Sequence, residues 1–285
     1  MPIEAQIVAD SINSGGDRMT TMNWVYPRFI HAEVMTHRKF SRNASSSRAI
    51  PVKKMLADIW NDPAAPIYWG AKQPGMQARV ELSGWRKAAC KGLWNGSSKL
   101  MCGVSWLMDR LGLHKQIANR VTEPWQHINV LVTSTEWENF FKLRCHPDAQ
   151  PEIQALANQA KLVLAVSMPQ PLNEGEWHLP YVSTIGRRKM SKANAVQVSA
   201  ARCCRVSYLN HGGLKSTVKE DQALYNRLVS ADPPHMSPVE HQARAMPGGQ
   251  YANLSGWMSH RYYLENAPKS PLSTGGQDAD NNEST

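Results

Sequence analysis

The sequence has no hydrophobic run that is long enough to cross a membrane. Its longest purely apolar stretches, such as residues 162–166, fall far short of the roughly 18 residues that a membrane-spanning helix needs. The first residues also lack the basic start and apolar stretch of a signal peptide. We therefore expect no membrane association and a location in the cytoplasm, or in the host cytoplasm if the chain is viral.

Cysteine is scarce and is not spaced for a metal site or a disulfide framework. The five cysteines include no Cys-x-x-Cys pair, which argues against a zinc ribbon. Two histidines and a glutamate occur in HMSPVEH (235–241), but the spacing is not His-Glu-x-x-His and a proline interrupts it, so a helical zinc pair is excluded. The sequence predicts reduced thiols and no metal site.

Blocks of like charge are also absent. Lysine and arginine number 32 against 23 acidic residues, a formal net charge of +9, yet no five basic residues are consecutive. A basic chain favours an anionic partner such as a nucleotide or a phosphorylated cofactor, while the scattered charge argues against a nucleic acid. Mild basicity without a specific partner is the alternative, and the charge alone does not decide between the two.

Helical and strand patterns alternate along the chain, which indicates the α+β class. The pattern predicts helices at residues 27–35, 52–60, 79–111, 135–144, 147–166, 220–230 and 256–264. It predicts strands at residues 128–134 and after the turn that begins at residue 233, and it leaves 199–208 open between helix and strand. Residues 1–22 are expected to be a flexible lead, 23–266 a single α+β domain and 267–285 a disordered tail.

The densest group of polar side chains lies in THRKFSRNASSSR (36–48). Arginine guanidinium groups and several serine hydroxyls occur together in this stretch. Arginine binds phosphate through two parallel hydrogen bonds and serine hydroxyls add further donors, so the segment suits a phosphate group. A solvated basic loop is the alternative interpretation.

Arg144 ends a predicted helix just before Cys145, His146 and Pro147. A cation at a helix C-terminus is favourable through the helix dipole alone, so this position also has a purely structural explanation. Cys145 and His146 are sequence neighbours that point in different directions, so we reject them as a nucleophile and its base.

Two blocks of the chain resemble the signature of the flavin-dependent thymidylate synthases. The first is THRKFSRNASSSR (36–48), which is similar to the family's Arg-His-Arg segment. The second is Arg120 with Pro124, then a strand and a helix that ends at Arg144, then AQPEI (149–153).

Two further blocks strengthen the resemblance and show an altered order. They are ARCCRVSY (201–208) and HMSPVEH (235–241). In most of the family these two blocks come before the Arg-His-Arg segment, whereas here they follow it. The resemblance therefore implies an α+β fold of the flavin-dependent thymidylate synthase type that is circularly permuted, assembled as a homotetramer with active sites shared between subunits.

The resemblance also implies a reaction, the reductive methylation of dUMP to dTMP. FAD would be the cofactor, with NADPH and 5,10-methylenetetrahydrofolate as cosubstrates. Arg144 would stabilise the negative charge that develops on the pyrimidine ring, and Ser46 is the second catalytic residue. The implied nucleotide site consists of Glu33, Ser45, Ser46, Ser47, Arg48, Arg120 and Arg144. The implied FAD site consists of Thr36, His37, Arg38, Asn43, Thr133, Thr135, Asn139, His235, Ser237 and Glu240.

Three positions depart from the family's pattern and leave the substrate open. Thr36 replaces the first arginine of the signature, Ala44 replaces a glutamate, and Glu33 stands where a glutamine is usual. A carboxylate only accepts hydrogen bonds where an amide also donates them, so the accepted base could differ. One alternative is the same chemistry on another pyrimidine nucleotide, as methylation or hydroxymethylation of dCMP. The other is a catalytically inactive protein that binds nucleotides or nucleic acid.

Overall fold

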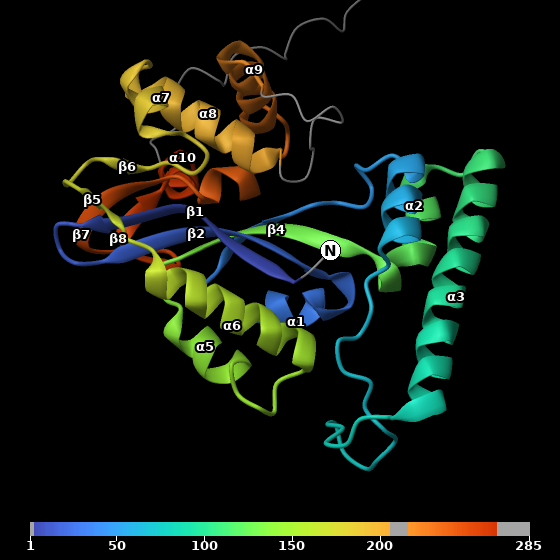
Figure 1. Cartoon of the computed structure of the whole chain (residues 1–285). Coiled ribbons are helices and arrows are strands. Elements are labelled where there is room, and N and C mark those ends of the chain that lie inside the picture. The colour runs from blue at the N-terminus through green and yellow to red at the C-terminus, as the bar shows by residue number, and fades with distance from the viewer. Residues whose placement is uncertain (1–2, 206–215, 267–285) are drawn as a thin grey trace, which may run out of the picture.

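The structure is a computed structural model that describes residues 3–205 and 216–266, and it has two sheets covered by helices (Figure 1). The larger sheet has five strands in the order β3-β4-β2-β1-β5, all antiparallel to their neighbours except β1 and β5. Its strands are β1 (Glu4–Asn13), β2 (Arg18–Pro27), β3 (Ser41–Ala44), β4 (His127–Ser134) and β5 (Gln170–Leu172). The mixed architecture confirms the α+β class.

The central strand β2 gives the larger sheet two different faces, because successive side chains of a strand point in opposite directions. Met22, Trp24 and Tyr26 are fully buried on one face. There the Trp24 ring stacks on Phe140 at a centroid distance of 5.3 Å and meets Phe40 edge-on at 5.7 Å. The opposite face carries polar side chains of β2, β3 and β4, which are covered by the second layer of helices.

The helices that follow β2 and β4 in sequence cover the apolar face, as Figure 1 shows. They are α1 (His31–Met35), preceded by the 3₁₀ turn η1 (Arg28–Ile30), with α5 (Glu138–Arg144) and α6 (Pro151–Val166). Pro151 lies in the first turn of α6, where a missing backbone N–H costs no hydrogen bond. Glu152 of α6 is buried and accepts a hydrogen bond from the backbone N–H of Ile67 at 2.8 Å, which ties a long loop to this layer.

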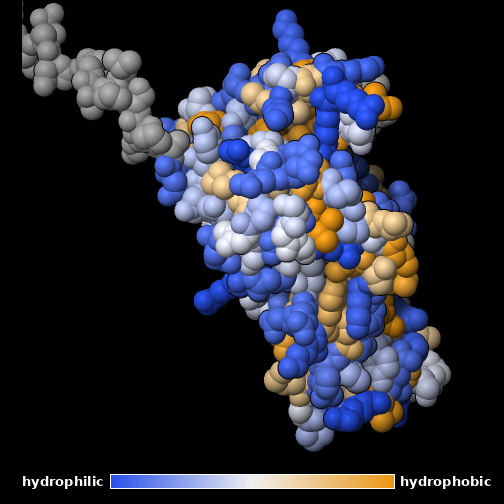
Figure 2. Space-filling view, turned by 90° about the vertical axis from the view of Figure 1, so that its left-hand side faces the viewer, coloured by the Kyte–Doolittle hydropathy of each residue, from blue (hydrophilic) through white to orange (hydrophobic). Residues whose placement is uncertain are grey.

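The second layer contains the smaller antiparallel sheet and four helices. The strands are β6 (Trp177–His178), β7 (Ala243–Tyr251) and β8 (Leu254–Ser259). The helices are α7 (Thr184–Arg188), α8 (Lys192–Cys204), α9 (Val218–Val229) and α10 (His260–Asn266), with the 3₁₀ turn η3 (Ser237–Glu240). Seen from the side of β5 to β8, the surface is mainly hydrophilic with hydrophobic residues along one flank (Figure 2).

Two helices stand to one side of the larger sheet (Figure 1). They are α2 (Val52–Asn61) and the 27-residue α3 (Gly84–Arg110), which lead through α4 (Lys115–Ala118) and the 3₁₀ helix η2 (Asn119–Trp125) into β4. Of α3, only Ser98, Cys102 and Ser105 are buried. The helix is confirmed, but large apolar residues spaced along it do not face the core of this chain, since they are exposed: Trp85, Leu93, Leu100, Trp106 and Leu107.

Several sequence predictions are wrong in ways that have a physical cause. Residues 1–22 are not a loose lead, because they form β1 and the start of β2 in the middle of the sheet; their polar side chains find partners there. Residues 256–264 are not one helix, since β8 ends at Ser259 and α10 begins at His260. The ambiguous stretch beginning at residue 199 is helical through Cys204, and the expected tail at 267–285 lies outside the described residues.

Candidate functional site

Arg144 lies at the end of α5 and reaches across to the segment around α1. Its Nε donates to Nε2 of His37 at 3.0 Å, its Nη1 to Oε2 of Glu33 at 3.0 Å, and its Nη2 to the hydroxyl of Thr36 at 3.3 Å. The residues that this contact joins are more than 100 positions apart in the sequence. We call Glu33, Thr36, His37 and Arg144 the Arg144 cluster.

His37 is held as a neutral acceptor in this cluster. Its ring packs edge-on against Phe140, with a centroid distance of 4.9 Å, and the side chain is buried. Burial, together with the nearby charges of Arg144 and Arg42, lowers the pKa of His37 to about 4. Because a guanidinium only donates hydrogen bonds, Nε2 of His37 carries the lone pair and the ring proton is on Nδ1.

Arg42 fixes the backbone on which the cluster is built. Its Nη1 donates to the carbonyl oxygens of Val34, Met35 and His37 at 3.0–3.2 Å. These carbonyls belong to the last turn of α1 and the residues just after it, where a helix leaves carbonyl oxygens without helical partners. Those of Val34 and His37 also accept the backbone N–H groups of His37 and Phe40 at 3.3 Å. The arginine therefore holds the signature segment in place by a structural contact.

The Arg144 cluster is accessible and has no net charge. The side chain of Arg144 is 21% exposed and that of Glu33 35% exposed, so a ligand can contact both. One guanidinium, one carboxylate and one neutral imidazole sum to zero. A positive charge aimed alone at a ligand, as the resemblance implies for Arg144, is therefore not what this arrangement presents.

A second group of residues surrounds Glu123 in η2. The Glu123 carboxylate pairs with Arg120 at 2.8 Å and with Arg28 at 3.1 Å, and it accepts from the Ser47 hydroxyl at 3.5 Å. We call Arg28, Ser47, Arg120 and Glu123 the Glu123 cluster. Two arginines and one carboxylate leave one positive charge, which suits an anion such as a phosphate.

The remaining residues of the expected phosphate segment lie next to this cluster. The Ser45 hydroxyl accepts the backbone N–H of Asn129 at 3.0 Å, which ties the segment to β4. The Ser46 hydroxyl accepts the backbone N–H of Arg48 at 3.3 Å. The side chain of Arg48 is exposed and donates to no partner within residues 3–205 and 216–266. Of this segment, Arg48 and Ser46 present groups that a phosphate could contact.

The two clusters lie at opposite ends of β3 in one chain. His37 comes before Ser41, the first residue of β3, and Ser47 comes after Ala44, the last. From Ser41 to Ala44 the strand spans about 10 Å, at about 3.3 Å per residue, and this length separates the two clusters. The structure thus brings the predicted nucleotide residues together as two groups and not as one.

Five of the residues expected to hold FAD are exposed: Thr36 of the Arg144 cluster, Arg38, Asn139, His235 and Ser237. Arg38 and Asn139 each adjoin one member of the packed pair His37 and Phe140, so they lie near the Arg144 cluster. Arginine, asparagine, histidine and serine donate to the phosphate oxygens and ring edges of a dinucleotide. The chemistry of this exposed set fits FAD.

Three other residues of the expected FAD set have their polar groups engaged within the chain. Thr133 is fully buried in the sheet. The buried Asn43 side chain donates to the carbonyl oxygen of Cys203 at 2.7 Å, and the Thr135 hydroxyl accepts the backbone N–H of Ser255 at 3.1 Å. A ligand would reach Thr133 only if the layers of the fold separated.

Glu240 is also engaged, through an ion pair with Arg261 of α10. Arg261 pairs in turn with Glu265 at 2.7 Å, one helical turn further on. The carboxylate of Glu240 is half-buried in this pair, so it anchors α10 to η3. FAD would therefore have to compete with Arg261 for the Glu240 carboxylate.

A buried hydrogen-bonded chain crosses the polar face of the larger sheet, and sequence reasoning missed it. It runs from Ser11 to Nδ1 of His178 at 2.9 Å, from Nε2 of His178 to Thr21 at 2.8 Å, from Thr21 to Thr133 at 2.7 Å and on to Nδ1 of His241 at 2.8 Å. Burial lowers the pKa of each histidine to about 3. Of its two threonines only Thr133 lay in a predicted strand, so the sequence pattern did not reveal this chain.

Four of the five cysteines offer no activated thiol, because burial raises their pKa values. Burial raises the pKa of Cys204 to about 11 and raises the pKa values of Cys102, Cys145 and Cys203 as well. Such thiols stay protonated and are poor nucleophiles. Among the same described residues, no three His, Cys, Asp or Glu side chains are grouped to hold a metal ion, and no helix combines the length and apolar character of a membrane span.

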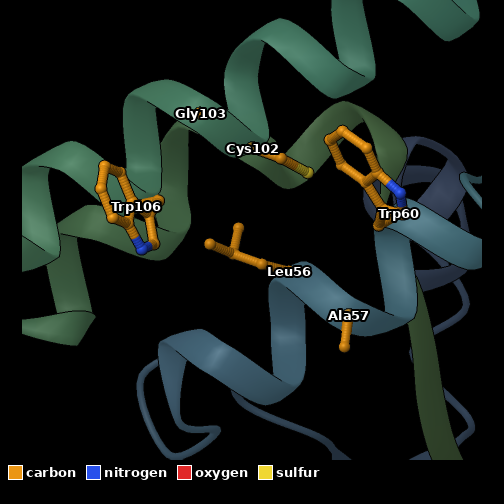
Figure 3. Close-up of a pocket in the computed structure, with 6 residues that line it drawn as sticks. All are labelled: Leu56, Ala57, Trp60, Cys102, Gly103 and Trp106. Atoms are coloured by element: carbon orange, nitrogen blue, oxygen red, sulfur yellow. The ribbon is translucent and has the colours of Figure 1, made fainter.

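A separate apolar groove lies between α2 and α3. It has a volume of about 320 Å³ and is lined by Leu56, Ala57, Trp60, Cys102, Gly103 and Trp106. Figure 3 shows the two tryptophans on either side of Leu56. Trp60 and Trp106 are 56% and 52% exposed, and the lining of the groove is almost entirely apolar.

Comparison with known proteins gives no relative by sequence: no protein-family model matches the chain, and neither does any curated protein. Among solved structures, it is similar to the UMP/dUMP methylase PolB from Streptomyces cacaoi. The complex with 5-Br UMP has 16% identity and a TM-score of 0.46, covering 57% of this chain and 89% of PolB. The complex with 5-Br dUMP has 16% identity and a TM-score of 0.48, covering 57% and 90%. At these values the likeness carries no inference about activity.

Proposed function

We propose that this chain is an enzyme that methylates the C5 position of a pyrimidine deoxynucleotide, with the dUMP-to-dTMP reaction of the flavin-dependent thymidylate synthases as the reference case. The observation that carries the proposal is the Arg144 cluster. Two motif blocks that resemble the same family meet there through the hydrogen bonds of Arg144 to Thr36 and His37, although more than 100 residues separate them. A solvated basic loop and a helix-capping arginine, the two structural alternatives, do not require this meeting.

The Glu123 cluster supports a phosphate-binding role for its neighbourhood. Arg48 and Ser46 would contact the phosphate of the nucleotide, and Arg120 would turn from Glu123 to the more highly charged phosphate. Each charge-assisted hydrogen bond of this kind contributes about 1.5–3 kcal/mol. Arg28 keeps Glu123 paired when Arg120 moves, so the exchange leaves no carboxylate without a cation.

The cofactor expected from the resemblance is FAD, with NADPH and 5,10-methylenetetrahydrofolate as cosubstrates. A bound flavin would supply the hydride that completes the methyl group. The exposed residues Arg38, Asn139, His235 and Ser237 would hold it, whereas Thr133 and Asn43 serve the fold. His37 keeps Arg144 oriented through the 3.0 Å hydrogen bond and stays neutral at neutral pH.

An active site shared between subunits would allow the Arg144 cluster and the Glu123 cluster to contact the same nucleotide. In one chain they lie at opposite ends of β3, so one nucleotide would be completed by the Arg144 cluster of one subunit and the phosphate segment of another. The exposed apolar side chains of α3 and the groove beside α2 provide a surface for contact between copies, because large apolar patches mark interaction sites. A homotetramer is the assembly that we propose.

The carboxylate of Glu33 keeps dCMP as a second candidate substrate, with methylation or hydroxymethylation as the outcome. An inactive binding protein is the third candidate, which absence of flavin would favour. The test is product identification by mass spectrometry, using the purified protein with FAD, NADPH and methylenetetrahydrofolate and either dUMP or dCMP. A gain of one methyl or one hydroxymethyl group on either nucleotide supports the proposal. No mass change on either nucleotide, with the protein folded and flavin-bound, would refute it.

A further inference from the structure

The outer face of α3 carries large apolar side chains that the described part of the chain leaves exposed. Leu93, Leu100 and Leu107 follow one another at intervals of seven residues, and each is more than half exposed. The helix contacts the rest of the chain through its opposite side, where its three buried residues lie: Ser98, Cys102 and Ser105. At 3.6 residues per turn, the three leucines lie on the side that points away from these residues.

Small residues alternate with these leucines along the same face. Ala89, Gly96 and Gly103 also recur every seven residues and are exposed. Glycine is a poor helix former, so the two glycines weaken α3 as an isolated helix. Nothing in the described residues requires them, because a Cβ at Gly96 or Gly103 would meet no atom within 4 Å. The glycines therefore indicate that a segment from outside the described residues approaches this face closely. We call these six residues the α3 stripe: Ala89, Leu93, Gly96, Leu100, Gly103 and Leu107.

We propose that the α3 stripe packs against the α3 stripe of a second copy, as an antiparallel helix pair whose twofold axis lies at the level of residue 98. The facing residues are then Leu93 with Gly103, Leu100 with Gly96, and Leu107 with Ala89. Each leucine of one copy meets a small residue of the other, and the twofold axis repeats every contact. In a parallel pair leucine would meet leucine and glycine would meet glycine, which leaves gaps at the glycines.

The apolar surface around the stripe is large enough for a stable contact. Gly103 also lines the groove beside α2, so Leu93 of the second copy lies at the edge of that groove. At the ends of the helix, Trp85 of one copy faces Leu111 of the other, and both residues are more than half exposed. With the three leucines, five large side chains per copy take part, and at about 100 Å² each the pair buries on the order of 1,000 Å². The glycine backbones and the groove add to this area, which brings it to the lower end of the about 1,200–2,000 Å² of stable interfaces.

The charges near the stripe do not set the register. None of the six residues of the α3 stripe is charged. Three cations flank it, and each lies over a tryptophan ring of its own chain, at 5.9, 4.5 and 5.4 Å: Arg86 over Trp85, Lys99 over Trp60, and Arg110 over Trp106. The match of leucines to small residues therefore defines the pair. The inference rests on the assembly that we propose with the function, and it does not depend on the reaction.

Light scattering after size exclusion of the full chain measures whether α3 pairs in this way. Gly96→Leu should reduce the molar mass to about half that of the wild type, because the added leucine meets Leu100 of the other copy. Each copy should stay folded in circular dichroism, since the space around Gly96 is open within the described chain. Ala88→Leu is the matched control, which adds the same side chain at an exposed position of α3 outside the stripe and should keep the wild-type mass.

An exchange of two facing residues tests the register. Leu100→Ala alone should weaken the pair, whereas Gly96→Leu combined with Leu100→Ala should recover the wild-type mass, because a leucine again faces a small residue. In a parallel pair these two positions do not face each other, and the mass should not recover.

Three results would overturn the inference: a wild-type chain with the mass of one copy, an unchanged mass for Gly96→Leu, or a double variant as dissociated as Gly96→Leu. Nucleotide methylation by a single-copy wild type would overturn the pairing and keep the proposed reaction. A wild type that pairs as expected but forms no nucleotide product would refute the proposed reaction and keep the pairing.

Discussion

Lowering the pH from 7 to 5 is expected to destabilise the folded chain, chiefly through two histidines that it buries completely. His178 and His241 have no exposed surface, and burial lowers the pKa of each to about 3. In the unfolded chain a histidine has a pKa of about 6.5. The unfolded state therefore takes up protons between these values while the folded state does not, and stability falls as the pH falls below about 6.5.

The magnitude follows from the proton uptake of the unfolded chain. From pH 7 to pH 5 one such histidine costs about 2 kcal/mol, and the pair costs about 4 kcal/mol. The result does not depend on how far the folded pKa lies below about 4. His37, His127 and His260, whose pKa values are lowered to about 4, act in the same direction. Typical domains are stable by about 5–15 kcal/mol, so the loss is large.

Urea unfolding followed by tryptophan fluorescence at pH 7, 6 and 5 measures this loss. In His241→Gln about half of the loss assigned to the pair should disappear, because one titrating group is gone. His146→Gln, at an exposed position, should keep the wild-type pH dependence. A wild-type change below about 1 kcal/mol, or a His241→Gln variant with the full pH dependence, would refute the reasoning.

Three further predictions address catalysis, packing and assembly. Arg144→Ala should abolish turnover of the nucleotide while the FAD absorbance of the protein is retained. An unchanged kcat in steady-state assays would contradict the proposed role of Arg144 in catalysis. Asp221→Ala should lower the free energy of unfolding by at least about 2 kcal/mol in urea titrations, because it removes the buried carboxylate that Arg202 and Arg205 share at 3.0 and 3.1 Å; a loss below about 0.5 kcal/mol would argue against this. Trp106→Ser should shift the protein to smaller species in light scattering after size exclusion, since it removes an exposed apolar contact of α3, and an unchanged mass would exclude the groove as an interface.

The local sequence pattern was sufficient to predict those helices and strands whose characteristic residues recur with a clear period. The apolar positions of 52–60 predicted α2, and the β-branched run at 128–134 predicted β4. It failed at residues 1–22, because a bulge between Ile7 and Ala9 and the consecutive polar residues Thr20 and Thr21 break the alternation of apolar and polar residues that marks a half-buried strand. It also failed for the face of α3, since exposure of Trp85 or Leu100 depends on what the helix packs against and not on its own period.

The sequence by itself determined which chemical groups are present: a segment with arginines and serines, an arginine at a helix end, and two later blocks that complete the resemblance. Only the tertiary structure decided which residues each of these groups contacts. It joined Glu33, Thr36 and His37 to Arg144, and it placed Thr133 in a buried chain where the sequence suggested a cofactor contact. The reason is that periodicity reports on neighbours within a few residues, whereas hydrogen bonds and burial depend on segments that meet only when the chain is folded.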